Sequence, residues 1–171
     1  VRLEQRLGFR LETRTAELVA NALELLQRVS GERLRHELEL ILEERSPGMA
    51  VRRLGELGVL RCLEPGLEYD EWLGGKLELV VSRHQNQADS IHPEPERPAT
   101  RVEQKDLLLA LVTYRLDTVQ LDRFLSRLRF SLDVGKFLRE VHELRALAHR
   151  MEKEDLSASR IYRALKGFSA E

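Results

Sequence analysis

Apolar residues recur in the first half of this chain at the three- and four-residue spacing that places them on one face of an α-helix. The clearest stripe is Leu34, Leu38, Ile41 and Leu42, which follows the helix-capping residue Ser30. The helices expected here are residues 1–7, a helix capped by Thr13 or Thr15 that continues through Leu26, one that starts after Ser30, one from Pro47 to Gly58, and one that begins near Tyr69.

The second half of the chain has the same helical spacing. Helices are expected over residues 107–116, from Asp117, from near Ser131 and from about Ser157. No segment shows the strict alternation of apolar and polar residues that is typical of a half-buried strand. The sequence therefore predicts an all-α fold, an antiparallel multi-helix array without a β-sheet.

One segment interrupts the helical pattern. The stretch "QNQADSIHPEPERPAT" has three prolines within six positions and almost no large apolar residue. Such a segment buries too little surface to offset the entropy of ordering it, so residues 89–102 are predicted to form a flexible linker. The linker divides the chain into two small subdomains, residues 1–88 and 103–171.

Composition restricts the class of protein. The chain has 171 residues, 42% of them hydrophobic and 33% charged, and a net charge of −1. No apolar run approaches the roughly 18 residues of a membrane-spanning helix, and the amino terminus has no signal-peptide pattern, so no membrane partner is predicted and a cytoplasmic location is expected. Because the first residue is Val1, we expect that the chain was processed or cut from a longer protein.

Candidate metal ligands are few. Cys62 is the only cysteine, which excludes an intramolecular disulfide and a cysteine-based zinc site, and it is expected in the core. His142 and His149 share a helix face but are seven residues apart, which is wider than the four-residue spacing of helical zinc sites. No metal site is predicted.

Arginine dominates the basic residues, because 23 of the 28 are Arg, whose planar fork suits phosphate and also stacks on bases. Two strips with helical spacing are candidate RNA contacts: Arg123, Arg127, Lys136 and Arg139; and Arg160, Arg163 and Lys166. Spacing alone favours solvated helix faces balanced by acidic residues, so the interpretation as RNA contacts depends on the family resemblance described next. Trp72 is expected in the core, with stacking on a base as the alternative.

Three stretches within residues 1–67 carry a family resemblance. They read "VRLEQRLGFRLETRTAELV", "SGERLRHELELILEE" and "AVRRLGELGVLRCLEPGL". They resemble the neck region of the bacterial tRNA nucleotidyltransferase (CCA-adding enzyme) and poly(A) polymerase family, in which a "GF" turn precedes a Ser-x-Glu-Arg-hydrophobic-x-x-Glu motif. The matching residues are Gly8, Phe9, Ser30, Glu32, Arg33 and Glu37. The end of the chain, "DLSASRIYRALKGFSAE", resembles the family's carboxy-terminal helix more weakly.

The resemblance implies a different role for each part of the chain. Residues 1–88 would form a neck-like RNA-binding domain in which Ser30, Glu32, Arg33 and Glu37 brace the helices beside a nucleotide site, and residues 103–171 would be body-like and tail-like. The chain lacks the family's Gly-Ser turn and paired aspartates. It is therefore expected to have no catalytic residue or cofactor of its own and to be inactive alone.

The implied partners are tRNA or another RNA 3′ end and a catalytic head domain of the same parent chain. The parent enzyme is expected to use Mg²⁺ with ATP or CTP. Whether it adds CCA, part of CCA or poly(A) is left open. The alternative function is a helical protein–protein interaction module without a nucleic-acid role, which would bind through apolar grooves.

Overall fold

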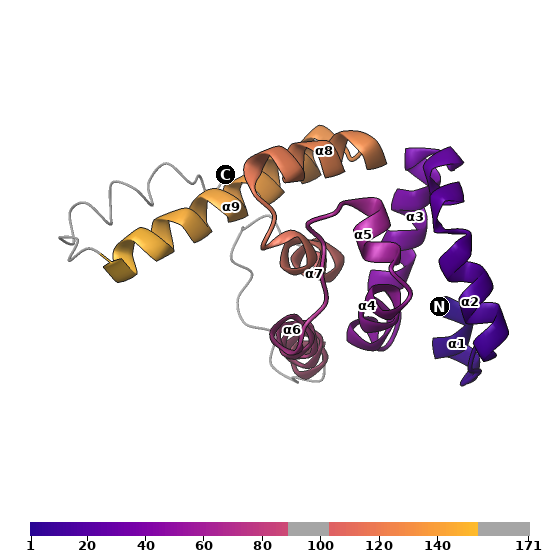
Figure 1. Ribbon diagram of the computed structural model, residues 1–171. Helices are drawn as coiled ribbons and strands as arrows, with labels where there is room; N and C mark the ends of the chain where they lie inside the picture. The colour runs from indigo at the N-terminus through magenta and orange to yellow at the C-terminus, as the bar shows by residue number, and fades with distance from the viewer. Residues whose placement is uncertain (89–102, 154–171) are drawn as a thin grey trace.

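The computed structural model describes residues 1–88 and 103–153, and every regular element in these ranges is a helix. The all-α prediction is confirmed. The elements are α1 (Arg2–Leu7), α2 (Thr13–Asn21), η1 (Leu23–Arg28), α3 (Gly31–Leu42), α4 (Pro47–Glu56), α5 (Val59–Leu63), α6 (Glu71–Ala88), α7 (Gln104–Thr113), α8 (Thr118–Leu128) and α9 (Leu132–Lys153). Helices α1 and α2 lie at one end of the molecule and α9 extends from the other (Figure 1).

Local sequence signals explain most helix ends. Gly8 ends α1 in the left-handed conformation, with φ of 66°, which glycine adopts without a side-chain clash. Pro47 occupies the first turn of α4, where its missing N–H costs no hydrogen bond. Asp117 and Gln120 form a capping box, in which each side chain accepts a hydrogen bond from the other residue's backbone N–H. The predicted end of α1 and the predicted starts of α4 and α8 are therefore confirmed.

Two local predictions are wrong. The helix expected through Leu26 breaks at Ala22 into α2 and the 3₁₀-helix η1, and Glu12 rather than a threonine precedes α2. Between Gly58 and Tyr69, where no helix was expected, the chain forms the short helix α5. Helices η1 and α5 pack on each other, so a contact between segments distant in sequence accompanies both differences.

A single cluster of buried apolar side chains joins the first and second halves of the chain. It extends from Leu38 and Leu42 in α3 to Phe124 in α8 and Leu138 in α9. Helix α6 packs on both α4 and α7, and α3 packs on α7 and α8. The core of the described residues is therefore continuous across the predicted linker, and the division into two subdomains stays a prediction.

Some predictions fall outside the described residues. These are the linker 89–102 and the helix from about Ser157. Within the described residues, no helix is both long enough and apolar enough to cross a membrane.

Candidate functional site

Ion pairs attach α1 to α3. Arg2 lies 3.1 Å from Glu37 and 3.2 Å from Glu44, and Arg6 lies 2.9 Å from Glu44. Glu44 thus pairs with two guanidinium groups. The hydrogen bond from Arg6, and to a smaller extent that from Arg2, holds the pKa of the Glu44 carboxyl below its ordinary value. Arg2 and Arg6 therefore hold α1 against α3 and the residues that follow it.

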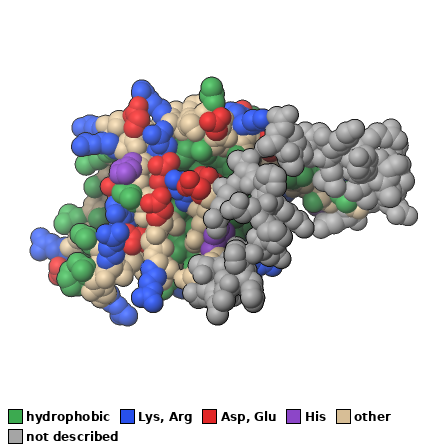
Figure 2. Space-filling model, turned by 180° about the vertical axis from the view of Figure 1, so that it is seen from behind, with side chains coloured by type: hydrophobic (Ala, Val, Ile, Leu, Met, Phe, Trp, Pro, Cys, Tyr) green, Lys and Arg blue, Asp and Glu red, His purple; other side chains and the backbone are tan. Residues whose placement is uncertain are grey.

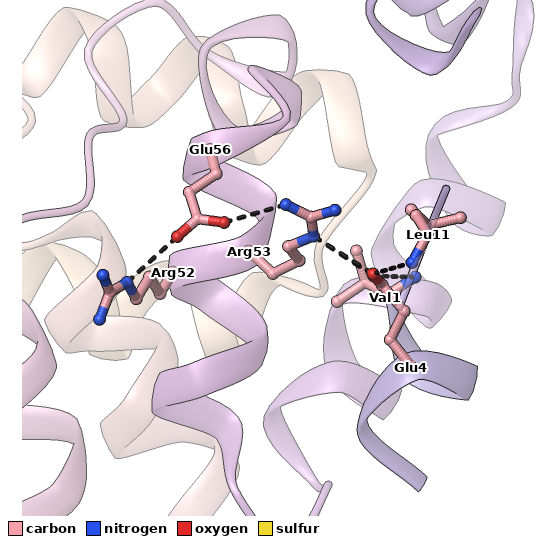
Figure 3. Close-up of polar contacts among 6 residues, drawn as sticks. All are labelled: Val1, Glu4, Leu11, Arg52, Arg53 and Glu56. Atoms are coloured by element: carbon pink, nitrogen blue, oxygen red, sulfur yellow. Dashed lines mark hydrogen bonds and ion pairs between the residues drawn. The ribbon is translucent and has the colours of Figure 1, made fainter. Parts of the chain in front are cut away.

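A second contact attaches α1 to α4 (Figure 3). Glu4, whose side chain is only 11% exposed, accepts hydrogen bonds from the Leu11 N–H at 3.1 Å and from Arg53. Burial alone would raise the pKa of the Glu4 carboxyl, but these hydrogen bonds outweigh burial and lower the pKa. Arg53 also reaches Glu56, as does Arg52, so Figure 3 shows Arg53 as the bridge between the two helices.

The start of α3 rests on the end of α8. A Cβ atom on Gly31 would overlap the carbonyl oxygen of Arg127 and lie 3.2 Å from the Leu128 Cα, so only glycine fits at this crossing. Glu32 accepts from Arg129 at 2.7 Å, and Arg35 donates to the carbonyl oxygen of Arg129. Among the described residues, Arg129 is the one non-glycine residue with positive φ, 53°. These contacts hold it there.

The four residues of the predicted motif have different surroundings. Ser30 is at the N-cap position of α3, but its side chain makes no capping hydrogen bond. Glu32 and Glu37 join α3 to α8 and α1, respectively. Arg33 is exposed and makes no ion pair within the described residues, whereas Glu37 pairs with Arg2. A bracing role beside a nucleotide site stays a prediction.

Arg123, a predicted RNA contact, is engaged by a buried carboxylate. Its Nε and terminal nitrogen lie 2.9 Å and 2.8 Å from the two oxygens of Glu64, a bidentate pair. Glu64 is 1% exposed, and Arg123 is its one ion-pair partner among the described residues. Removing Arg123 would leave a buried charge uncompensated, so its guanidinium is held by the fold.

The rest of the strip on α8 and α9 is mostly paired as well. Arg139 lies 2.8 Å from Asp122, and Lys136 lies 4.0 Å from Glu140. Arg127 differs, because its Nε is buried and has no hydrogen-bond partner among the described residues. The second predicted strip, Arg160, Arg163 and Lys166, lies outside the described residues. RNA contact by any of these residues stays a prediction.

A group that the sequence analysis missed lies at the other end of the molecule. Seven exposed arginines make no ion pair within the described residues. Arg45, Arg83 and Arg150 lie elsewhere in the molecule, and the other four are Arg10, Arg14, Arg28 and Arg33. These four extend from the turn after α1 through α2 and η1 to the start of α3. We call these four the unpaired arginines. The sequence analysis named Arg33 as part of the Ser-x-Glu-Arg motif, but no sequence signal marks Arg10, Arg14 or Arg28 as unpaired, because pairing depends on carboxylates brought close by the fold.

Hollows adjoin two of these arginines, Arg10 and Arg33. Arg10 lines an open cavity of about 900 Å³ together with Phe9 and Thr15. Arg33 lines an apolar groove of about 500 Å³ between η1 and α3, whose floor includes Leu26 and Val29. On the face shown in Figure 2, basic side chains lie among acidic and hydrophobic ones. The guanidinium groups of Arg10 and Arg33, which have no carboxylate partner among the described residues, therefore lie beside concave surfaces.

Other candidate residues have ordinary surroundings. Cys62 is half-buried and donates from its thiol to the Leu23 carbonyl oxygen at 3.2 Å. His142 Nε2 lies 3.0 Å from the Thr113 carbonyl oxygen, and burial lowers the pKa of its imidazole. The described residues contain no group of three or more side chains that could hold a metal ion.

Comparisons with known proteins agree with the resemblance. Residues 8–71 match the family described as "Probable RNA and SrmB- binding site of polymerase A". The A-adding tRNA nucleotidyltransferase of Geobacter sulfurreducens is 45% identical over 69 residues, which are 39% of this chain and 8% of that protein. The helices superpose on a CCA-adding enzyme solved with ATP with a TM-score of 0.68 and 27% identity. The resemblance to the tRNA nucleotidyltransferase and poly(A) polymerase family is confirmed.

The similarity extends along the whole chain but covers a minority of each relative. The alignment with the ATP-bound CCA-adding enzyme includes 99% of this chain and 39% of the other. The Thermotoga maritima CCA-adding enzyme complexed with tRNA gives a TM-score of 0.67 at 27% identity, over 99% of this chain and 40% of that one. The chain thus spans about two fifths of these solved relatives.

The segment that matches the RNA-binding family contains all four unpaired arginines. Residues 8–71 start at the turn after α1 and end at the start of α6. Arg123, Lys136 and Arg139 lie beyond this segment and are all ion-paired. Of the seven exposed arginines without an ion pair among the described residues, five therefore lie in the segment whose family description names RNA, and Arg83 and Arg150 lie outside it.

Proposed function

We propose that this chain is the RNA-binding helical part of a tRNA nucleotidyltransferase or poly(A) polymerase-like enzyme and that it positions the 3′ end of a tRNA for nucleotide addition. The observation that carries the proposal is the location of the unpaired arginines Arg10, Arg14, Arg28 and Arg33 inside the segment that matches the RNA-binding family.

The physical basis is the charge of the RNA backbone. Phosphate contacts supply most of the affinity of a protein that reads the shape of RNA, and guanidinium groups match phosphate geometry. An arginine already paired with a carboxylate must give up that pair before it binds phosphate. The unpaired arginines are free of this cost. The ion pairs of Arg2, Arg6 and Arg53 hold the helices that carry them.

The nucleotide transfer itself is assigned to a separate catalytic head domain of the parent protein. Because the described residues do not gather a metal-binding group, we propose that the Mg²⁺ and the ATP or CTP expected of the family act in that domain. By the same reasoning, this chain alone has no transferase activity. The cytoplasmic location expected from the sequence stays a prediction.

Fluorescence anisotropy with a labelled tRNA that lacks its 3′ CCA tests the proposal. Binding is expected at low salt and should weaken steeply as salt rises, because each phosphate contact releases a counterion. An unlabelled tRNA of different sequence should compete, since phosphate and shape contacts carry little sequence information.

The alternative, a protein-interaction module, predicts a different result. An apolar interface would be nearly insensitive to salt, and the labelled tRNA would not bind. No binding at low salt with tens of micromolar protein would therefore contradict the proposed function. The apolar groove between η1 and α3 would then be the first surface to examine.

A further inference from the structure

Trp72 is part of an aromatic and arginine cluster on the surface. The indole was expected in the core, yet it is 37% exposed, so that expectation is wrong. The core side of α6 is instead occupied by Leu73 and Leu77, which are 3% and 0% exposed. Trp72 points away from the core, and its burial does not explain why a large aromatic residue occupies this position.

The cluster is assembled from three helices. The Trp72 ring, at the start of α6, lies 5.3 Å from the ring of Tyr114 at the end of α7, with 31° between the planes. The guanidinium of Arg115 lies 4.9 Å from the centre of the Trp72 ring, and that of Arg145, from α9, lies 5.3 Å from the centre of the Tyr114 ring. We call these four residues the stacking cluster.

Polar contacts fix the cluster in place. Arg145 donates to the carbonyl oxygen of Tyr114, and Arg115 pairs with Asp70. Asp70 also accepts from the Leu73 N–H at 2.9 Å, which fixes the start of α6. The Arg115–Asp70 pair is exposed on both sides, 52% and 40%, and such a pair adds little stability, so Arg115 is able to exchange Asp70 for a phosphate.

The chemistry of the cluster suits a nucleobase. Proteins that hold single-stranded nucleic acid stack bases on aromatic rings and place Arg beside them to contact the backbone. We infer that the stacking cluster is a second RNA contact, in which an unpaired base stacks on the Trp72 indole and Arg115 contacts a neighbouring phosphate. This inference rests on the proposed function, because it requires that the chain binds RNA.

Trp72 reports on its own environment, because it is the only tryptophan in the chain. We would titrate the protein with the tRNA that lacks its 3′ CCA and record anisotropy of the labelled RNA and emission of Trp72 in parallel. A blunt RNA duplex without unpaired bases serves as the matched control. The inference predicts that the tRNA quenches Trp72 and shields it from acrylamide, whereas bound duplex leaves both measurements unchanged.

The outcomes separate the two proposals. If anisotropy rises while Trp72 emission and acrylamide quenching stay unchanged, the stacking cluster is not an RNA contact and the proposed function stands. If anisotropy does not rise at low salt, the proposed function is contradicted and the inference fails with it.

Variants give a second measurement. Trp72→Leu should weaken tRNA binding about tenfold, because it removes the stacking surface, and Trp72→Phe should restore most of the affinity. Leu132→Ala is the control, since Leu132 is 88% exposed on α9 and lies outside the cluster. Circular dichroism checks that each variant folds. Equal affinity of the Leu, Phe and control variants would overturn the inference.

Discussion

Three basic residues of α8 and α9 differ from the unpaired arginines of α2, η1 and the start of α3 in one respect, which is whether each one is paired with a carboxylate. Arg123, Lys136 and Arg139 have helical spacing and face acidic partners. Arg14, Arg28 and Arg33 have no regular spacing and no ion pair within the described residues. Spacing shows which residues share a helix face, whereas the fold decides which of them are free.

The two regions are also joined by one hydrophobic core. Phe124 is 0% exposed, and its ring lies 5.5 Å from that of Phe130 in the core that joins both halves. Phe124→Ala is expected to cost about 3–5 kcal/mol of unfolding free energy, because it opens a large cavity. Urea unfolding followed by helical circular dichroism and by Trp72 emission should give coincident transitions in the parent and the variant. Two separate transitions would show that the regions are independent.

The α3–α8 crossing tests how the regions are joined. Gly31→Ala should cost about 1–3 kcal/mol, because the added Cβ meets backbone atoms of α8 that cannot move aside singly. Gly75→Ala is the matched control, since a Cβ there has nothing within 4 Å and α6 continues through it. It should stabilise the fold by about 0.5–1 kcal/mol. Equal effects of the two variants in urea unfolding would contradict the close crossing.

The bridge between α1 and α4 tests the structural role of paired arginines. Arg53→Ala should cost about 1 kcal/mol, because it leaves the nearly buried Glu4 without its guanidinium partner. The neighbouring Arg52→Ala removes only a contact with Glu56 at the surface and should change stability by less than about 0.5 kcal/mol. Thermal unfolding of the two variants side by side gives the comparison. A larger loss in Arg52→Ala would contradict the bridge.

The same bridge has a pH signature. The pKa of Glu4 is lower in the folded protein than its ordinary value of 4.5, so its contribution to stability is present above about pH 4.5 and is lost as pH falls through the folded pKa. The difference in stability between the parent and Arg53→Ala should therefore shrink in acid. A difference that stays constant from pH 6 to pH 3 would show that Glu4 is not the group that Arg53 stabilises.

The helices could largely be predicted from the sequence, because caps and apolar stripes are local signals. Gly8, Pro47 and Asp117 each act within one turn of the helix that they start or end. The break at Ala22 was missed because no glycine or proline marks it in the sequence.

The candidate site was harder to predict, because its residues meet across long sequence distances. Glu64 and Arg123 are 59 residues apart, and Glu32 and Arg129 are 97 apart. No spacing rule connects such pairs, so paired residues such as Arg123 and Arg139 were predicted as contacts, and of the unpaired arginines only Arg33 was named, for its place in the motif. Trp72 was expected in the core because tryptophan is usually well buried, whereas here Leu73 and Leu77 take the core positions.

The most direct test compares tRNA affinity after two basic residues are removed from each region. Arg28→Ala/Arg33→Ala removes two unpaired arginines, and Lys136→Ala/Arg139→Ala removes the same charge from the paired strip. At fixed salt we predict that the first variant weakens binding at least tenfold and flattens its salt dependence, while the second stays within about twofold. A greater loss in Lys136→Ala/Arg139→Ala would contradict the account, because it would show that RNA binds the strip that the ion pairs occupy.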